Sequence, residues 1–186
     1  MLGLFERRAT TRAVRRTIVP TGRERRFRRQ DFILSKTDLK GRITYANDTF
    51  LAISGFTEKE VLGAPHSIVR HPEMPRCVFQ YFWETISSGK EIFAYVVNLC
   101  KNGDHYWVLA HVTPTFDGDG KIIGYHSNRR SPDPAAVAEI KRIYGELLTI
   151  ERNHQDRKAG LAASRAALDR MIADKGLCFN EFTLSL

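Results

Sequence analysis

Asn98 is the polar residue that contrasts most with its neighbours, because it interrupts the apolar run Ala94-Tyr95-Val96-Val97-Asn98-Leu99. A buried side-chain amide without a hydrogen-bond partner costs about 1–3 kcal/mol. The amide donates and accepts hydrogen bonds at once, so it suits the pyrimidine edge of a flavin or a nucleobase. A backbone partner at the end of a strand would satisfy the same group. Asn98 is therefore a candidate ligand contact, and both interpretations stay open.

Histidine and cysteine, which often bind metals or act as nucleophiles, form no familiar constellation in this chain. His66 and His71 lie five residues apart in a segment broken by prolines, a poor spacing for a shared metal ion, although either could ligate haem iron. The three cysteines, Cys77, Cys100 and Cys178, have no zinc-site spacing and favour a reducing, cytoplasmic setting. We find no Walker loop, GxGxxG motif or Ser-His-Asp order, so we expect a protein that is not an enzyme.

The positive charge is concentrated at the N-terminus. The 186-residue chain has a formal net charge of +8, and residues 1–30 hold ten arginines against Glu6 and Glu24, so this arm accounts for the whole excess. Such an arm could contact anionic lipid, an acidic protein face or nucleic acid, or act as a solubilising tail. Leu2, Leu4 and Phe5 precede the arginines and could hold the protein at the periphery of a membrane. An arginine-rich, acid-poor start is also typical of organellar transit peptides.

Five strands and several helices are needed to position these residues. Alternating apolar positions and glycine-containing turns predict strands at 32–38, 42–46, 92–100, 105–116 and 121–130. Two short helices follow the second strand, the first capped by Asn47 or Asp48 and the second begun by a capping box at Thr57–Glu60. Apolar residues at intervals of three and four predict helices over 76–88, 134–153 and 156–175. This order predicts an α+β domain with an antiparallel sheet and helices over one face.

Strand 105–116 has two faces of different character. One is apolar apart from a phenol and consists of Tyr106, Val108, Ala110 and Val112. The other consists of His105, Trp107, Leu109 and His111. We expect the first set to face the helices, with the small Ala110 leaving room beside it.

Several motifs between residues 31 and 131 resemble the PAS domain family. They are YANDTF at 45–50, SGFT at 54–57, EVLG at 60–63, NGDHYWV at 102–108 and IGY at 123–125. The segment VRHPEMP at 69–75 is similar to a narrower group, the FAD-binding PAS domains of bacterial aerotaxis transducers, which are redox sensors.

The resemblance implies a fold and a cofactor. The family has a five-stranded antiparallel sheet whose concave face and short covering helices enclose a small cavity, here with flanking C-terminal helices. The cofactor-linked residues of the family fall on Arg70, His71, Trp83 and Asn98. Arg70 would meet a phosphate or carbonyl oxygen, His71 the isoalloxazine edge, and Trp83 would wall the pocket by stacking. We add Tyr106 and Asn47 as further candidate contacts of FAD.

Two departures from the flavin-binding pattern leave other functions open. Ile92 stands where those members carry a tryptophan, and Leu99-Cys100 where they carry two arginines. A cofactor-free PAS adaptor that works by protein contact and a haem-binding PAS sensor remain alternatives. A blue-light sensor of the flavin–cysteinyl type is not expected. Its chemistry needs a thiolate on the turn before Cys77, and no cysteine precedes Cys77 in the sequence.

The expected organisation is a basic arm at 1–30, a sensor domain at 31–131 and a helical extension at 132–186. No kinase, cyclase or methyl-accepting segment follows the sensor, so we expect a stand-alone module that signals to another protein. Family analogy implies a histidine kinase or a chemotaxis component as that partner. The apolar stripe of helix 134–153 could form a homodimer or pack on its own sheet.

Overall fold

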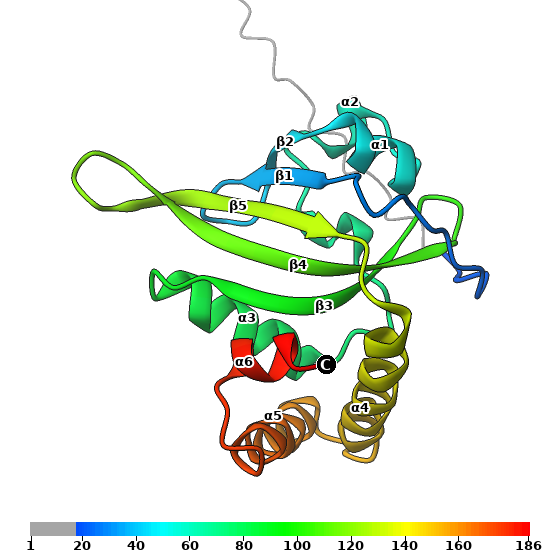
Figure 1. The fold of residues 1–186 in the computed structure, drawn as a ribbon, viewed down its shortest axis with the longest axis vertical. Helices are drawn as coiled ribbons and strands as arrows, with labels where there is room; N and C mark the ends of the chain where they lie inside the picture. Colours follow the sequence, from blue (N-terminus) through cyan, green and yellow to red (C-terminus); the bar gives the residue numbers. More distant parts are fainter. Residues whose placement is uncertain (1–17) are drawn as a thin grey trace, which may run out of the picture.

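The strands expected from the sequence pair into one antiparallel sheet in the computed structural model, which describes residues 18–186 (Figure 1). The sheet order β2-β1-β5-β4-β3 places the first strand beside the last, with Ile33 opposite Arg129. The strands are β1 (Ile33–Thr37), β2 (Ile43–Ala46), β3 (Ile92–Leu99), β4 (His105–Phe116) and β5 (Ile122–Arg130). The predicted α+β class and five-stranded sheet are therefore confirmed.

Tight turns fix the register of the hairpins. Asp38 accepts hydrogen bonds from the backbone N–H groups of Lys40 and Arg42, both at 2.8 Å, and Gly41 adopts a φ of +70°. Asp117 does the same in the β4–β5 turn, where it accepts from Asp119 and Lys121. These are the carboxylate turns that the Asp and Gly residues of both connections favour.

Short helices lie between the two hairpins in sequence. They are α1 (Asp48–Ser54), α2 (Glu58–Val61), the 3-10 helix η1 (His66–Val69) and α3 (Arg76–Ser87). Asn47 caps α1, and the expected Thr57–Glu60 capping box begins α2. The helix η1 was not predicted, because Pro65 and the prolines that follow it indicate turns rather than a helix.

The three C-terminal helices are α4 (Pro134–Arg152), α5 (Arg157–Ala173) and α6 (Phe179–Leu184). Of these, α4 packs on the outer side of the sheet, α6 lies along the edge strand β3, and α5 packs against α3 and α4 (Figure 1). The hydroxyl of Tyr144 on α4 donates to the carbonyl of Tyr95 at 2.6 Å, and the side chain of Asn180 on α6 accepts from the N–H of Phe93 at 2.9 Å. Unpaired groups of the edge strand β3 are thus satisfied from within the chain.

The apolar stripe of α4 is buried in this arrangement. Ile140, Tyr144 and Leu147 are each at most 4% exposed, and the ring of Tyr144 lies 6.2 Å from that of Trp107 on the outer face of β4. Of the two roles left open for the stripe, the structure shows packing on its own sheet. None of the helices formed by residues 18–186 combines the length and apolarity needed to cross a bilayer.

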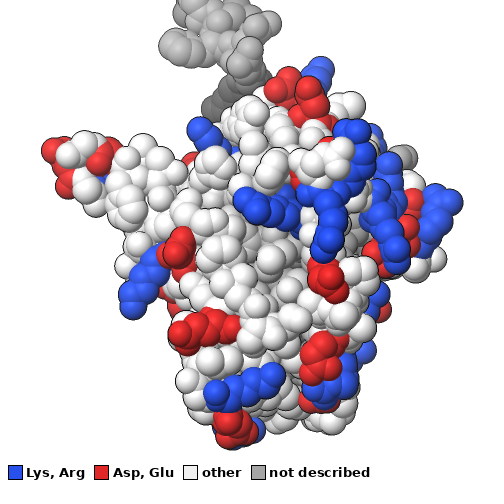
Figure 2. Space-filling model, in the orientation of Figure 1, with Lys and Arg blue, Asp and Glu red and all other residues white. Residues whose placement is uncertain are grey.

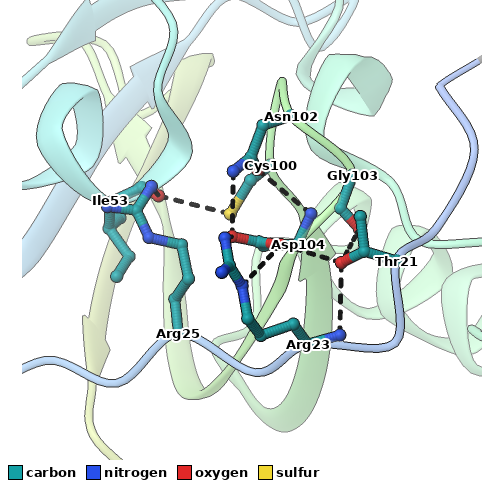
Figure 3. Close-up of polar contacts among 8 residues, drawn as sticks. All are labelled: Thr21, Arg23, Arg25, Ile53, Cys100, Asn102, Gly103 and Asp104. Carbon is teal, nitrogen blue, oxygen red and sulfur yellow. Dashed lines mark hydrogen bonds and ion pairs between the residues drawn. The ribbon is translucent and has the colours of Figure 1, made fainter.

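The described part of the basic arm is bound to the domain. Residues 18–29, here called the N-terminal strap, run past the β3–β4 turn (Figure 3). There Arg25 N donates to His105 O and His105 N donates to Arg23 O. Asp104 is 2% exposed and accepts from Thr21 Oγ1 at 2.7 Å and from Arg23 Nη2 at 2.9 Å. Residues 1–17, where the rest of the predicted arm falls, lie outside the described residues.

Candidate functional site

A cavity of about 300 Å³ opens between the inner face of the sheet and the helices η1 and α3. Its floor includes Val96, Ala110 and Val112, and its helical wall includes Phe79 and Phe82. The apolar set on β4 was expected to face the helices, and all four of its members are at most 4% exposed. The face prediction is confirmed, and Ala110 lines the space that its small side chain was expected to leave.

The mouth of the cavity is shaped by Trp83 and Gly41. Trp83 is 39% exposed, and its ring lies 5.7 Å from that of Tyr125 in an edge-on contact. A Cβ atom added to Gly41 would come within 3.0 Å of the indole. A side chain at position 41 would therefore displace Trp83, so glycine serves both the tight turn and the placement of the indole.

Asn98 projects an unsatisfied donor at this cavity. The residue lines the wall and is 4% exposed, yet its amide nitrogen Nδ2 has no hydrogen-bond partner within residues 18–186. Its backbone is already paired, because Asn98 forms bridges with both Tyr106 and Arg70. The side chain is thus left to bind something other than the described chain, which supports the ligand interpretation of this asparagine.

Arg129 is the cavity residue that sequence reasoning missed. It is 2% exposed, its Nε donates to Ser127 Oγ at 2.9 Å, and its Nη2 donates to Ser35 Oγ and to His66 Nε2, the latter at 2.9 Å. Its remaining nitrogen, Nη1, has no partner in the described chain. The three groups that accept from Arg129 are all uncharged, and no acidic side chain among residues 18–186 lines the cavity.

The electrostatics of the Arg129 cluster follow from this burial. Burial lowers the pKa of Arg129 to about 10, so the guanidinium still carries its charge at neutral pH. Burial, together with the charge of Arg129, lowers the pKa of His66 to about 3. His66 is therefore neutral and accepts at Nε2. The cavity contains a buried cation whose charge no carboxylate of the described residues balances, and such a site favours a ligand with negative or acceptor atoms.

The sequence did contain a signal for Arg129. Along β5, Tyr125, Ser127 and Arg129 alternate with residues of the outer face, and all three line the cavity. Applying strand periodicity to β5 as well as β4 would have placed Arg129 on the inner face. The contact with His66 spans 63 positions in the chain, and no local pattern indicates it.

Comparison with known proteins agrees with this architecture. Residues 43–129 match the family model described as the PAS fold. The chain is also 44% identical over 115 residues to the aerotaxis receptor of Escherichia coli strain K12. Residues 43–129 therefore have the PAS fold.

The relatives are longer than this chain. The alignment with the aerotaxis receptor covers 62% of this chain and 22% of the receptor. A second relative, the bacterioopsin transcriptional activator of Halobacterium salinarum, is 26% identical over 153 residues, which cover 77% of this chain and 22% of the activator. The chain thus spans about a fifth of the length of these two relatives.

Solved structures show the same fold. A light-oxygen-voltage domain studied with a flavin analogue superimposes with a TM-score of 0.52 at 23% identity, covering 62% of this chain and 87% of that domain. The predicted PAS fold with flanking helices is confirmed.

Three of the six residues expected to contact the cofactor line the cavity of this PAS domain, namely Arg70, Trp83 and Asn98. Arg70 is exposed, and its guanidinium lies 4.2 Å from the ring centroid of Phe79.

The other three lie away from the cavity wall. Asn47 has a structural role: its Oδ1 accepts from Leu34 N and Phe50 N, and its Nδ2 donates to Phe32 O. His71 is 4% exposed and packs against His105 with ring centroids 5.6 Å apart. Tyr106 pairs with Asn98 in the sheet but is fully buried in the core, and its hydroxyl has no partner in the described chain.

The three cysteines do not line the cavity. Cys77 is buried at the start of α3, and burial raises its pKa to about 11. Cys100 donates to Ile53 O at 3.2 Å, and Cys178 is exposed before α6. A flavin–cysteinyl bond would need a thiol at the ligand, and none of the three cysteines of the chain lines the cavity.

Proposed function

We propose that this PAS domain binds the isoalloxazine ring of FAD in the 300 Å³ cavity and reports redox or oxygen state to a signalling partner. The observation that carries the proposal is a pair of buried donors, Asn98 Nδ2 and Arg129 Nη1, that lack partners in the described chain and belong to side chains lining an otherwise largely apolar space. The pyrimidine edge of a flavin presents carbonyl and nitrogen acceptors. Its flat ring system suits walls of valine, phenylalanine and tryptophan.

The chain's own residues would hold and orient the ring. Asn98 would donate to a carbonyl oxygen, Arg129 would place a positive charge beside the acceptor edge, and Trp83 would shield the ring from water at the mouth. When bound, FAD supplies reversible electron uptake, which changes the charge of the ring. Arg129 would favour the more negative form, because no carboxylate lining the cavity in the described chain balances its charge.

A haem cofactor has less support. His66 is the histidine that lines the cavity, and its Nε2 accepts from the guanidinium of Arg129 at 2.9 Å. Iron ligation at this atom would require Arg129 to move away from its buried position. His71, the other candidate ligand, packs against His105 instead.

The relatives support a signalling role and a signalling partner. Besides the aerotaxis receptor, the chain is 26% identical over 115 residues to a blue-light-activated histidine kinase of Rhizobium johnstonii. A sensor kinase or a chemotaxis component is therefore the class of partner we propose.

The first test is the absorbance spectrum of the purified chain, before and after addition of FAD. We expect the two visible bands of oxidised flavin. The variant Asn98→Leu, which removes a donor at similar volume, should weaken FAD binding roughly tenfold. Asn128→Leu is the matched control, because Asn128 lies in the same sheet opposite the outer-face residue His111. A protein that stays colourless in excess FAD would contradict the proposal and favour the cofactor-free adaptor.

A further inference from the structure

The cavity is too small for a whole dinucleotide. Its volume of about 300 Å³ is at the lower end of the range for sites that hold one drug-sized ligand, roughly 300–1,000 Å³. If the isoalloxazine ring of FAD occupies it, the diphosphate and adenosine must lie outside the mouth. The surface next to the mouth therefore determines where the rest of the cofactor binds.

A second, more open groove of about 620 Å³ adjoins the mouth. It shares Arg70, Phe79 and Trp83 with the cavity and extends between α3 and the start of α5. The two helices are held together beside it, since Arg165 on α5 pairs with Glu84 on α3 at 2.6 Å. A ligand leaving the cavity past Trp83 would enter this groove directly.

The groove is strongly basic. Among residues 18–186, four cationic side chains line it, from Arg70, Arg76, Arg157 and Lys158, against one acidic side chain, Asp156. Asp156 is already engaged as the cap of α5, where it accepts from the backbone N–H groups of Lys158 and Ala159, both at 3.1 Å. The groove thus has an excess of positive charge that its own acidic residue does not balance.

The cations differ in how free they are to bind an anion. Arg76 is fixed, because its Nε donates to Glu151 at 2.8 Å and its Nη1 to the carbonyl of Arg157 at 2.9 Å. Arg157 and Lys158 are exposed, and within residues 18–186 their side chains form no ion pair. Arg70 stacks on Phe79 at the junction of cavity and groove, also without an ion pair in the described chain.

We propose that this groove binds the diphosphate of FAD, with Arg157 and Lys158 of α5 as its phosphate ligands and Arg70 at the junction. The inference rests on the proposed flavin function, because the ring in the cavity places the diphosphate here. It assigns a ligand-binding role to the C-terminal extension. Through Arg76 and Glu151, the groove is also joined to the end of α4.

The test compares the affinity of the full chain for FAD and for riboflavin, which lacks phosphate, at low and physiological salt. We expect the wild-type protein to bind FAD more tightly than riboflavin, by an amount that shrinks as salt rises. The double variant R157Q/K158Q should lose roughly tenfold in FAD affinity and leave riboflavin affinity unchanged. The control R170Q/K175Q removes the same charge near the far end of α5 and should leave both affinities unchanged.

The outcomes separate the two proposals. Equal affinities for FAD and riboflavin, or an R157Q/K158Q variant that binds FAD like the wild type, would overturn the diphosphate site while the flavin cavity stands. Failure of both flavins to bind would overturn the proposed function and the diphosphate site with it. A competition assay with ADP adds a direct readout, since ADP should displace FAD from the wild-type protein and lose this ability in R157Q/K158Q.

Discussion

At the scale of single residues, the cluster of Arg129, His66 and Ser35 determines the character of the cavity. A buried guanidinium is usually paired with a carboxylate, but here its partners are a histidine nitrogen and two hydroxyl groups. The arrangement keeps the charge of Arg129 available to a ligand. It also requires His66 to stay neutral, because a protonated imidazole could no longer accept from the guanidinium.

This requirement gives a pH dependence with a definite sign. His66 has a pKa of about 3 in the folded chain against an ordinary value of 6.5, so the unfolded chain binds more protons between these values. The stabilising contribution of neutral His66 is therefore present above pH 6.5 and is lost as pH falls towards 3. We expect His66→Gln, which keeps an acceptor without titrating, to make the free energy of unfolding less sensitive to pH in this window. Urea denaturation at several pH values would measure it.

If the free energy of unfolding of His66→Gln depended on pH as strongly as that of the wild type, His66 would not titrate as described. The control is His154→Gln, because His154 is exposed and its Nδ1 bonds the carbonyl of Ile150 at the end of α4, away from the Arg129 cluster. That variant should leave the pH slope unchanged.

At the scale of elements, one acidic residue, Asp104, anchors the N-terminal strap in addition to its backbone hydrogen bonds at the β3–β4 turn. Asp104 accepts from Thr21, Arg23 and Asn102, and these hydrogen bonds hold its pKa well below the usual range (Figure 3). Figure 2 shows Lys and Arg gathered on the side of the molecule where Figure 1 places the strap. The strap therefore fixes part of the basic surface against the β3–β4 turn.

Removing this carboxylate should release the strap without unfolding the sheet. We expect Asp104→Ala to speed trypsin cleavage after Arg25 and Arg26 severalfold. Both peptide bonds must detach from the surface of the domain before they can enter the active site of the protease. Asp119→Ala, at the tip of the β4–β5 turn, is the control with an unchanged rate. Equal cleavage rates in the two variants would show that Asp104 does not hold the strap.

The elements themselves were largely predictable, and their long-range partners were not. The Asp38–Gly41 and Asp117–Gly120 turns, the caps of α1 and α2 and the stripe of α4 are local patterns, so the sequence predicts them. The helix α6 was not predicted, because its capping box uses Cys178 with Glu181, an unusual pair. The three contacts expected at Asn47, His71 and Tyr106 lie off the cavity wall because tertiary packing, not residue type, determines which polar groups face it.

At the scale of the whole molecule, the cavity and the helix α4 lie on opposite sides of the same strands. Ala110 of β4 lines the cavity, whereas Trp107 of the same strand packs on Tyr144 and lies 5.5 Å from the amine of Lys141. Tyr144 also binds the edge of β3 at Tyr95. We therefore expect a change in the charge of a flavin bound beside Arg129 to shift the packing of α4 through strands β4 and β5.

This route predicts which helix should change its hydrogen exchange when bound FAD is reduced. We expect hydrogen exchange in α4 to change between the oxidised and reduced protein, while exchange in α2, which packs beside β2 and does not line the cavity, stays the same. Hydrogen–deuterium exchange with mass spectrometry would measure both helices in one experiment. Changes confined to α2, or none in α4, would contradict a route through the sheet.

The central claim is that the cavity holds a flavin ring by two donors that have no partner among residues 18–186. A crystal structure of the full chain with FAD tests it most directly. The account predicts the isoalloxazine ring between Ala110 and Trp83, with acceptor atoms within hydrogen-bond distance of Asn98 Nδ2 and Arg129 Nη1. A ring bound elsewhere, or a cavity closed by its own side chains in the presence of FAD, would contradict it.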